Sequence, residues 1–321
     1  MGLTHRYYDD INGIRMHTAE VGEGPPVILC HGFPELWYTW RHQMPALAEA
    51  GYRVIAPDLR GAGETTAPLD VAGYAPQNQC ADILSLMDRL GLEQATVIGH
   101  DWGSVLAWNL AFHHGDRLNA VGGINAPGLQ MLQAPVNLLT LLAAAPGIWD
   151  YQFYFQEPGI AEAEFEADVA RFHTLLRRSS RPEDGFDILR DFHSVRARGG
   201  LLVGYPQAPA RSAIMSEADL EVYVRNYRRT GFRGMLNYYR VYDQLAAWAG
   251  DLQGRTVDIP VFVLTCGKDP VMRPELTAGM EALAPNLTRG HIEDCAHWST
   301  EEQPDAVNRM LVEWLAKVLP A

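Results

Sequence analysis

Cysteine is scarce in this sequence, and the four cysteines present form no recognisable pair or cluster. They stand at positions 30, 80, 266 and 295, with no Cys-x-x-Cys motif and no cysteine–histidine spacing typical of a metal site. This distribution argues against a disulfide framework and is typical of reduced cysteines in a cytoplasmic protein. We therefore predict no metal site.

Positive charge and long apolar runs are also lacking. The chain has 26 Lys and Arg against 39 Asp and Glu, a formal charge of −13, which argues against a nucleic-acid partner and against binding to an anionic membrane. Its longest apolar stretch, residues 138–149, is too short to cross a bilayer and is interrupted by Pro146 and Gly147. Residues 1–8 lack the apolar core of a signal peptide. We expect a soluble, cytoplasmic protein.

Strand and helix patterns alternate along most of the chain. Continuous apolar runs at 27–30, 95–98 and 261–264 are typical of strands buried on both faces. Between residues 128 and 247 such runs nearly vanish, and helical periods rich in aromatic residues replace them. The pattern predicts an α/β fold with a mostly parallel sheet, in which residues 1–127 and 248–321 form the core and residues 128–247 an inserted helical cap.

The strongest functional signal is the sequence ATVIGHDWGS at residues 95–104, which combines a buried strand, a glycine-flanked turn and the start of a helix. This is the pattern of a nucleophile elbow, in which Gly99 and Gly103 permit a tight turn. The residue at its apex is Asp101 where serine is commoner. Because an ionised carboxylate needs no base to attack a saturated carbon, the motif favours covalent catalysis over seryl acyl transfer. A buried aspartate that only caps the helix is the alternative.

Two further polar residues follow the last two predicted strands. Asp269 comes shortly after the strand at 261–264, and His297 comes after the strand at 288–292. Open parallel sheets bind ligands at the carboxyl ends of their strands, so we expect both side chains near Asp101. Taken singly, Asp269 is equally typical of a helix cap and His297 of a structural histidine. Together, the order nucleophile, acid, histidine favours the triad of α/β-hydrolases.

The sequence HGFPE at residues 31–35 follows a predicted strand at the place where these hydrolases supply one N–H group of the oxyanion hole. The second N–H group comes from the residue after the nucleophile. We therefore assign the oxyanion hole to the backbone N–H groups of Phe33 and Trp102. A purely structural role of Phe33 in shaping the loop is compatible with this assignment. His31 and His100 are interpreted as structural histidines.

These motifs, with DCAHW at residues 294–298, resemble those of epoxide hydrolases of the α/β-hydrolase superfamily, close to the hydrolase domain of the soluble enzymes. The resemblance extends over residues 7–319. It implies an α/β-hydrolase fold with an eight-stranded, mostly parallel sheet and an all-helical cap. It also implies that the peptide bond between Phe33 and Pro34 is cis.

The cap carries the more specific part of the resemblance, in WDYQFYFQEPG at residues 149–159 and GFRGMLNYYR at residues 231–240. The resemblance implies that one tyrosine from each segment contacts the epoxide oxygen. The matching positions are Tyr151 and Tyr239. Their neighbours Tyr154 and Tyr238 are the alternatives if either motif is out of register.

The resemblance implies hydrolysis of a hydrophobic epoxide to a vicinal diol. Asp101 would form an ester with the substrate, water activated by His297 would hydrolyse the ester, and Asp269 would orient the imidazole. Tyrosine hydroxyls, with an ordinary pKa of about 10, stay protonated at neutral pH and suit donation to the leaving oxygen. This chemistry needs the epoxide and water but no metal and no organic cofactor. Three residues are expected to contact the substrate: Phe33, Trp102 and Gln152.

Two other functions stay open at this point. A haloalkane dehalogenase uses the same triad and ester, with Trp102 as one donor to the leaving halide. Phe33, where dehalogenases often have asparagine, and the paired cap tyrosines argue against it. A non-catalytic ligand-binding homologue has no need of three triad residues together. No motif indicates an oligomeric state.

Overall fold

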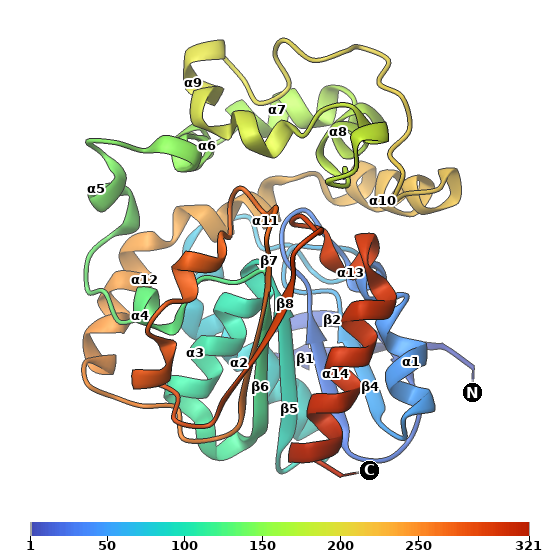
Figure 1. Ribbon diagram of the computed structural model, residues 1–321, viewed down its shortest axis with the longest axis vertical. Helices are drawn as coiled ribbons and strands as arrows, with labels where there is room; N and C mark the ends of the chain where they lie inside the picture. Colours follow the sequence, from blue (N-terminus) through green and yellow to red (C-terminus); the bar gives the residue numbers. More distant parts are fainter. Residues whose placement is uncertain (1, 321) are drawn as a thin grey trace.

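The computed structural model describes residues 2–320, which form an eight-stranded sheet covered by helices (Figure 1). The strands are β1 (Thr4–Ile11), β2 (Ile14–Val21), β3 (Pro26–Cys30), β4 (Arg53–Pro57), β5 (Ala95–His100), β6 (Leu118–Ile124), β7 (Val261–Cys266) and β8 (Leu287–Ile292). Their order across the sheet is β1-β2-β4-β3-β5-β6-β7-β8. Strand β2 is antiparallel to both of its neighbours, and all other pairs are parallel. The predicted eight-stranded, mostly parallel sheet is confirmed.

The central strands are the continuous apolar runs of the sequence. Every residue of β5 and of β7 is buried, because helices cover both faces of the sheet and leave no face for polar side chains. At the edge, β8 instead exposes Thr288, Arg289 and His291. Charged side chains on an edge strand oppose pairing with another chain. The interior of the sheet therefore places the carboxyl ends of β5, β6 and β7 side by side.

Helices lie on both faces of the sheet and above it. The α-helices are α1 (Gln43–Glu49), α2 (Pro76–Arg89), α3 (Trp102–His114), α4 (Leu129–Leu132), α5 (Leu138–Leu142), α6 (Asp150–Tyr154), α7 (Ile160–Ala167), α8 (Val169–Leu176), α9 (Val195–Arg198), α10 (Glu217–Thr230), α11 (Arg233–Leu236), α12 (Tyr242–Ala249), α13 (Ser299–Glu302) and α14 (Pro304–Val318). Helices α1 and α14 pack on one face, and α2 and α3 on the other. Among the described residues, no helix has the length and apolar character needed to cross a membrane.

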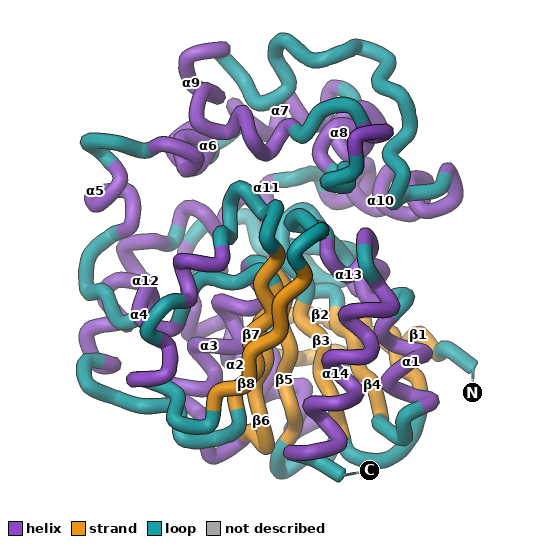
Figure 2. The backbone as a smooth tube through the Cα atoms, in the orientation of Figure 1, coloured by secondary structure: helices purple, strands orange, loops and turns teal. Residues whose placement is uncertain are grey.

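A second, helical layer lies over the carboxyl ends of the strands (Figure 2). Within the described chain no strand is assigned between β6 and β7, a stretch that includes helices α4 to α12. One apolar cluster joins Phe165 and Phe172 of this layer to Phe33, Trp102 and Trp298 of the core. The short helices of this layer are held by that shared cluster, and the predicted active-site residues lie at its junction with the core.

The ends of the helical insertion return to the level of the sheet. Helices α4 and α12 lie beside α3 and α2 rather than in the upper layer (Figure 1). The division into a core at 1–127 and 248–321 and a cap at 128–247 stays a prediction.

Candidate active site

Asp101 stands at a sharp turn between β5 and α3. Its backbone has φ +51° and ψ −120°, an uncommon conformation for a non-glycine residue that turns of this kind require. A Cβ on Gly99 would lie 2.1 Å from the carbonyl carbon of Gly103, and a Cβ on Gly103 would lie 2.0 Å from the carbonyl oxygen of Cys30. Only glycine fits at both positions, which is why the motif fixes the elbow in the sequence.

The loop after β3 supplies an N–H group to the Asp101 carboxylate. The backbone N–H of Phe33 donates to Oδ1 of Asp101 over 2.8 Å, and hydrogen bonding from the Trp102 N–H also stabilises this carboxylate. The Phe33–Pro34 peptide bond is cis, so that prediction is confirmed. The structure therefore brings the two predicted oxyanion donors to the predicted nucleophile.

His297 lies between the two acidic residues of the predicted triad. Its Nδ1 is 2.8 Å from Oδ2 of Asp269, and its Nε2 is 3.8 Å from Oδ2 of Asp101. Asp269 is held in turn by the N–H groups of Val271 and Met272, each at 2.9 Å from Oδ1. These contacts fix the imidazole with one nitrogen toward Asp269 and the other toward Asp101.

The pKa values of the three residues are displaced from their ordinary ranges. Burial raises the pKa of Asp101, and the nearby charges of His297 and His100 offset only part of that rise. Burial also opposes ionisation of Asp269, but its ion pair and hydrogen bond with His297 outweigh burial and lower its pKa. Burial lowers the pKa of His297, but Asp269 outweighs this effect and raises it. The buried site therefore combines two acidic side chains with one imidazole between them, and His297 favours the charged form of both acids.

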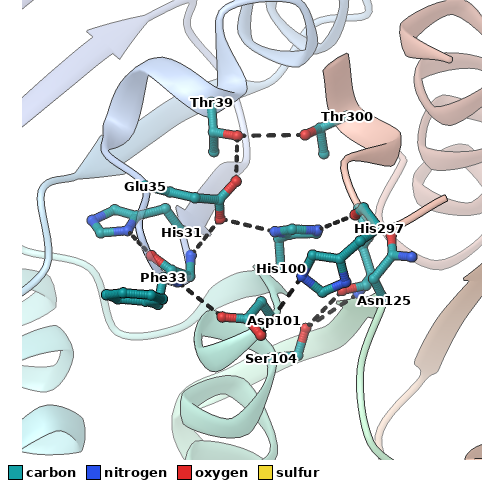
Figure 3. A network of polar contacts seen from close by, with 12 residues as sticks. His31, Phe33, Glu35, Thr39, His100, Asp101, Ser104, Asn125, His297 and Thr300 are labelled. Carbon is teal, nitrogen blue, oxygen red and sulfur yellow. Dashed lines mark hydrogen bonds and ion pairs between the residues drawn. The ribbon is translucent and has the colours of Figure 1, made fainter. Parts of the chain in front are cut away.

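A second buried ion pair supports the site, and sequence reasoning missed its role. Figure 3 shows His100 between Glu35 and the backbone of His297. Its Nδ1 is 2.8 Å from Oε2 of Glu35 and its Nε2 is 2.8 Å from the carbonyl oxygen of His297. Both partners are acceptors, so only the doubly protonated imidazolium satisfies both contacts. Glu35 raises the pKa of His100 to about 9 against the effect of burial.

Glu35 also fixes the loop that carries Phe33. Its Oε2 accepts a 2.6 Å hydrogen bond from the Gly32 N–H, and its Oε1 accepts one of 2.6 Å from the hydroxyl of Thr39. The ion pair therefore links the oxyanion loop to the segment that carries His297. The HGFPE motif contains Glu35, but nothing local in the sequence identifies a partner 65 residues away.

Asn125 is a further functional candidate that the sequence analysis did not name. It follows β6, with φ +47°, and its Nδ2 donates to Oδ2 of Asp269 over 2.8 Å. Its position directly after a parallel strand is the signal that located Asp269 and His297, and the same rule applied to β6 would have found it.

The cap brings Tyr151 and Tyr239 to the cavity that Asp101 lines. Tyr151 lies on α6 and Tyr239 on a 3₁₀ helix, η7 (Asn237–Arg240). Their rings meet edge to face with centroids 5.9 Å apart. The alternative tyrosines point elsewhere, because Tyr154 donates to Glu164 and Tyr238 to the backbone carbonyl of Arg60.

The cap tyrosines are buried and remain protonated. Burial raises the pKa of Tyr151 and of Tyr239, and the Asp101 charge adds to the rise in both. The amide of Gln152 connects Tyr151 to a tyrosine that the sequence analysis did not name. Its Nε2 donates to the Tyr151 hydroxyl over 3.2 Å, and its Oε1 accepts from Tyr242 over 2.8 Å. Gln152 thereby orients the Tyr151 hydroxyl as well as lining the cavity.

Two cavities meet at Asp101, Tyr151 and Tyr239. The larger, about 290 Å³, is also lined by the predicted substrate contacts Trp102 and Gln152. The smaller, about 30 Å³, is also lined by Phe33 and His297. The other walls of both are almost entirely apolar or aromatic. The site is therefore a largely apolar cavity whose wall includes the carboxyl group of Asp101 and the side chains of Tyr151 and Tyr239.

Comparisons with known proteins agree with this geometry. Residues 25–304 match the family model described as alpha/beta hydrolase fold. The chain is 37% identical to epoxide hydrolase A of Mycobacterium tuberculosis, over 98% of each chain. The structure of an epoxide hydrolase from an endophytic Streptomyces superposes with a TM-score of 0.89 at 36% identity, covering 99% of this chain and 96% of that one.

A longer relative matches over part of its length. The bifunctional epoxide hydrolase 2 of Sus scrofa is 42% identical over 98% of this chain but only 55% of its own. The chain thus spans about half the length of the mammalian relatives that it matches. From the sheet topology, the elbow and these matches together, the chain belongs to the α/β-hydrolase fold family and, within it, to the epoxide hydrolases.

Proposed function

We propose that this protein hydrolyses a hydrophobic epoxide to a vicinal diol through a covalent ester of Asp101. The observation that carries the proposal is the pair of cap hydroxyls on Tyr151 and Tyr239 in a cavity whose wall includes the Asp101 carboxylate. A nucleophile facing two hydroxyl donors matches a ring that opens at carbon while its oxygen takes up charge. The names of the matched relatives support the same reaction.

In the first step the Asp101 carboxylate attacks one ring carbon. A carbon–oxygen bond forms to the carboxylate, and the bond from that carbon to the ring oxygen breaks with its electron pair going to the oxygen. Tyr151 and Tyr239 donate hydrogen bonds to that oxygen, and one of them transfers its proton. General-acid help of this kind contributes about 10²- to 10⁴-fold to a rate.

In the second step His297 takes a proton from a water molecule, which attacks the carboxyl carbon of the ester. The N–H groups of Phe33 and Trp102 stabilise the oxyanion that forms there, and each such donor contributes about 10²- to 10³-fold. Asp269 stabilises the imidazolium. Collapse of the intermediate releases the diol and restores the Asp101 carboxylate, and proton return through His297 restores the tyrosine hydroxyl.

Turnover by the purified protein tests the proposal against its two rivals. Styrene oxide should give the diol, and 1-bromobutane should give no bromide. Bromide release without diol formation would assign the site to a dehalogenase. Binding of styrene oxide without turnover of either compound would indicate a non-catalytic homologue.

A further inference from the structure

The two cavities at the site differ about tenfold in volume, about 290 Å³ against about 30 Å³. We call them the large lobe and the small lobe. Asp101, Tyr151 and Tyr239 line both lobes, so an epoxide ring held between these three residues lies where the lobes meet. Substituents on its two carbons must then point into different lobes.

The small lobe has room for very little. Its volume is only about one tenth of that of the large lobe, so it accommodates a much smaller group. Its apolar walls include Leu189, Phe192 and Leu201, which are at most 6% exposed. The Trp298 indole N–H donates to the carbonyl oxygen of Leu176 over 2.9 Å, which fixes two further wall residues in place.

His297, the proposed general base, also restricts the size of the group that the small lobe can hold. His297 and Phe33 line the small lobe and are absent from the lining of the large one. The water that His297 activates must therefore reach the ester from the small lobe. A bulky substituent there competes with that water as well as with the walls, so it obstructs both binding and ester hydrolysis.

The large lobe is suited to an apolar substituent. Its walls combine residues of α3, α5 and α12 with Met272 of the core, including Val105, Leu138 and Leu245. It also reaches the exposed side chains of Val136 and Leu141, which are 42% and 58% accessible. The lobe thus continues toward the surface, and a long chain can extend along it.

We propose that the substrate is an epoxide with one bulky apolar substituent on one ring carbon and only hydrogen or methyl on the other. This selectivity rests on the proposed epoxide hydrolase function. The long substituent occupies the large lobe, and the unsubstituted or methyl-bearing carbon faces the small lobe.

Three isomeric epoxides test the proposal with the purified full chain: 1,2-epoxyoctane, trans-2,3-epoxyoctane and trans-4,5-epoxyoctane. The second and third have the same formula and one alkyl group on each ring carbon, but the 2,3-isomer carries methyl and pentyl groups whereas the 4,5-isomer carries two propyl groups, so the smallest group that the small lobe must hold grows from methyl to propyl. We expect kcat/KM for the 4,5-isomer to be at least about tenfold below that for the 2,3-isomer, since a pocket discriminates about 10- to 200-fold per methylene.

Shortening a side chain in the wall of the small lobe should lower the ratio of kcat/KM for the 2,3-isomer to kcat/KM for the 4,5-isomer. Leu201→Ala removes wall atoms there and should raise kcat/KM for the 4,5-isomer about tenfold relative to kcat/KM for 1,2-epoxyoctane. Leu189→Ala is a second variant of the same kind. The matched control is Leu202→Ala, at a buried neighbour of Leu201 that lines neither lobe, and it should leave the ratio of kcat/KM for the 2,3-isomer to that for the 4,5-isomer unchanged.

Equal kcat/KM values for the 2,3- and 4,5-isomers would overturn the selectivity while leaving the proposed function intact. A wild-type preference that neither small-lobe variant reduces would overturn the assignment of that preference to this lobe. Absence of turnover with all three isomers and with styrene oxide would instead refute the proposed function, and the selectivity with it.

Discussion

Replacement of His297 by glutamine should separate the two chemical steps. Attack by Asp101 on a saturated carbon needs no base, whereas water must lose a proton to attack the ester. Removal of a general base typically slows its step about 10²- to 10⁴-fold, which corresponds to about 3–5 kcal/mol in the barrier. We therefore expect His297→Gln to hydrolyse the ester at least about a hundredfold more slowly than the wild type.

The first step should survive in this variant. His297 is the strongest of the charges that lower the pKa of Asp101, so its loss raises that pKa further. His100 and the N–H groups of Phe33 and Trp102 remain to stabilise the carboxylate. These groups still favour the ionised form of Asp101, so at pH 8 alkylation should continue in this variant while ester hydrolysis is slowed.

Mass spectrometry and isotope labelling check both steps. His297→Gln incubated with styrene oxide should gain the mass of one epoxide on the peptide that contains Asp101, whereas His193→Gln, a change at an exposed cap histidine, should show no accumulated adduct. In a single turnover of the wild type in ¹⁸O-water, the diol should be largely unlabelled and Asp101 labelled. A labelled diol in the first turnover, with no adduct in His297→Gln, would refute the covalent mechanism.

Three further predictions concern the tyrosine proton donors, the pH dependence of ester hydrolysis and the ion pair between Glu35 and His100. The double variant Tyr151→Phe, Tyr239→Phe should reduce the rate of alkylation at least about a hundredfold. Its circular dichroism spectrum should be unchanged, since only two hydroxyl groups are lost. Near-normal turnover would contradict the role of these tyrosines. The pKa of His297 is raised above 6.5, and alkylation needs only that Asp101 is ionised. The ester should therefore accumulate as the pH falls through the pKa of His297, because hydrolysis slows before alkylation does. Stopped-flow traces in which both steps fail at the same pH would argue against the role of His297 as base. Glu35→Gln leaves His100 as an uncompensated buried cation, so urea unfolding should show a loss of about 3–5 kcal/mol, and unchanged stability would mean that His100 is neutral.

Formation of the ester should itself lower the pKa of His297. The Asp101 carboxylate is one of the groups that raise the pKa of this imidazole. Formation of the ester neutralises Asp101, so the pKa of His297 in the intermediate should lie below its value in the free enzyme. Ester hydrolysis should therefore persist to a lower pH than a titration of free His297 by NMR indicates. A hydrolysis profile with its midpoint above the NMR value would contradict this coupling.

The sequence predicted the core of the site because each of its parts is defined locally. The elbow requires glycine on both sides of Asp101, and these glycines lie within two residues of it. Asp269 and His297 follow strands whose apolar runs are easily recognised, and the carboxyl ends of parallel strands meet at one edge.

The supporting ion pair could not be predicted in the same way. Glu35 and His100 are wholly buried, and each contributes one charge that is tolerable only because the other is present. A single buried histidine or glutamate gives no indication in sequence of its partner. The interpretation of His100 as a structural histidine therefore missed its positive charge, which lowers the pKa values of both Asp101 and His297.

In the cap, helical periodicity could not predict which tyrosines face the cavity. Tyr151 and Tyr154 are three residues apart on α6, so helical spacing places them on similar faces and cannot choose between them. Tyr238 and Tyr239 are adjacent, so only one of them can face the cavity, but the pattern does not say which. The choice is made by hydrogen-bond partners distant in sequence: Glu164 accepts from Tyr154, and a carbonyl of the core accepts from Tyr238. With those two hydroxyls satisfied elsewhere, Tyr151 and Tyr239 are left to face the carboxylate.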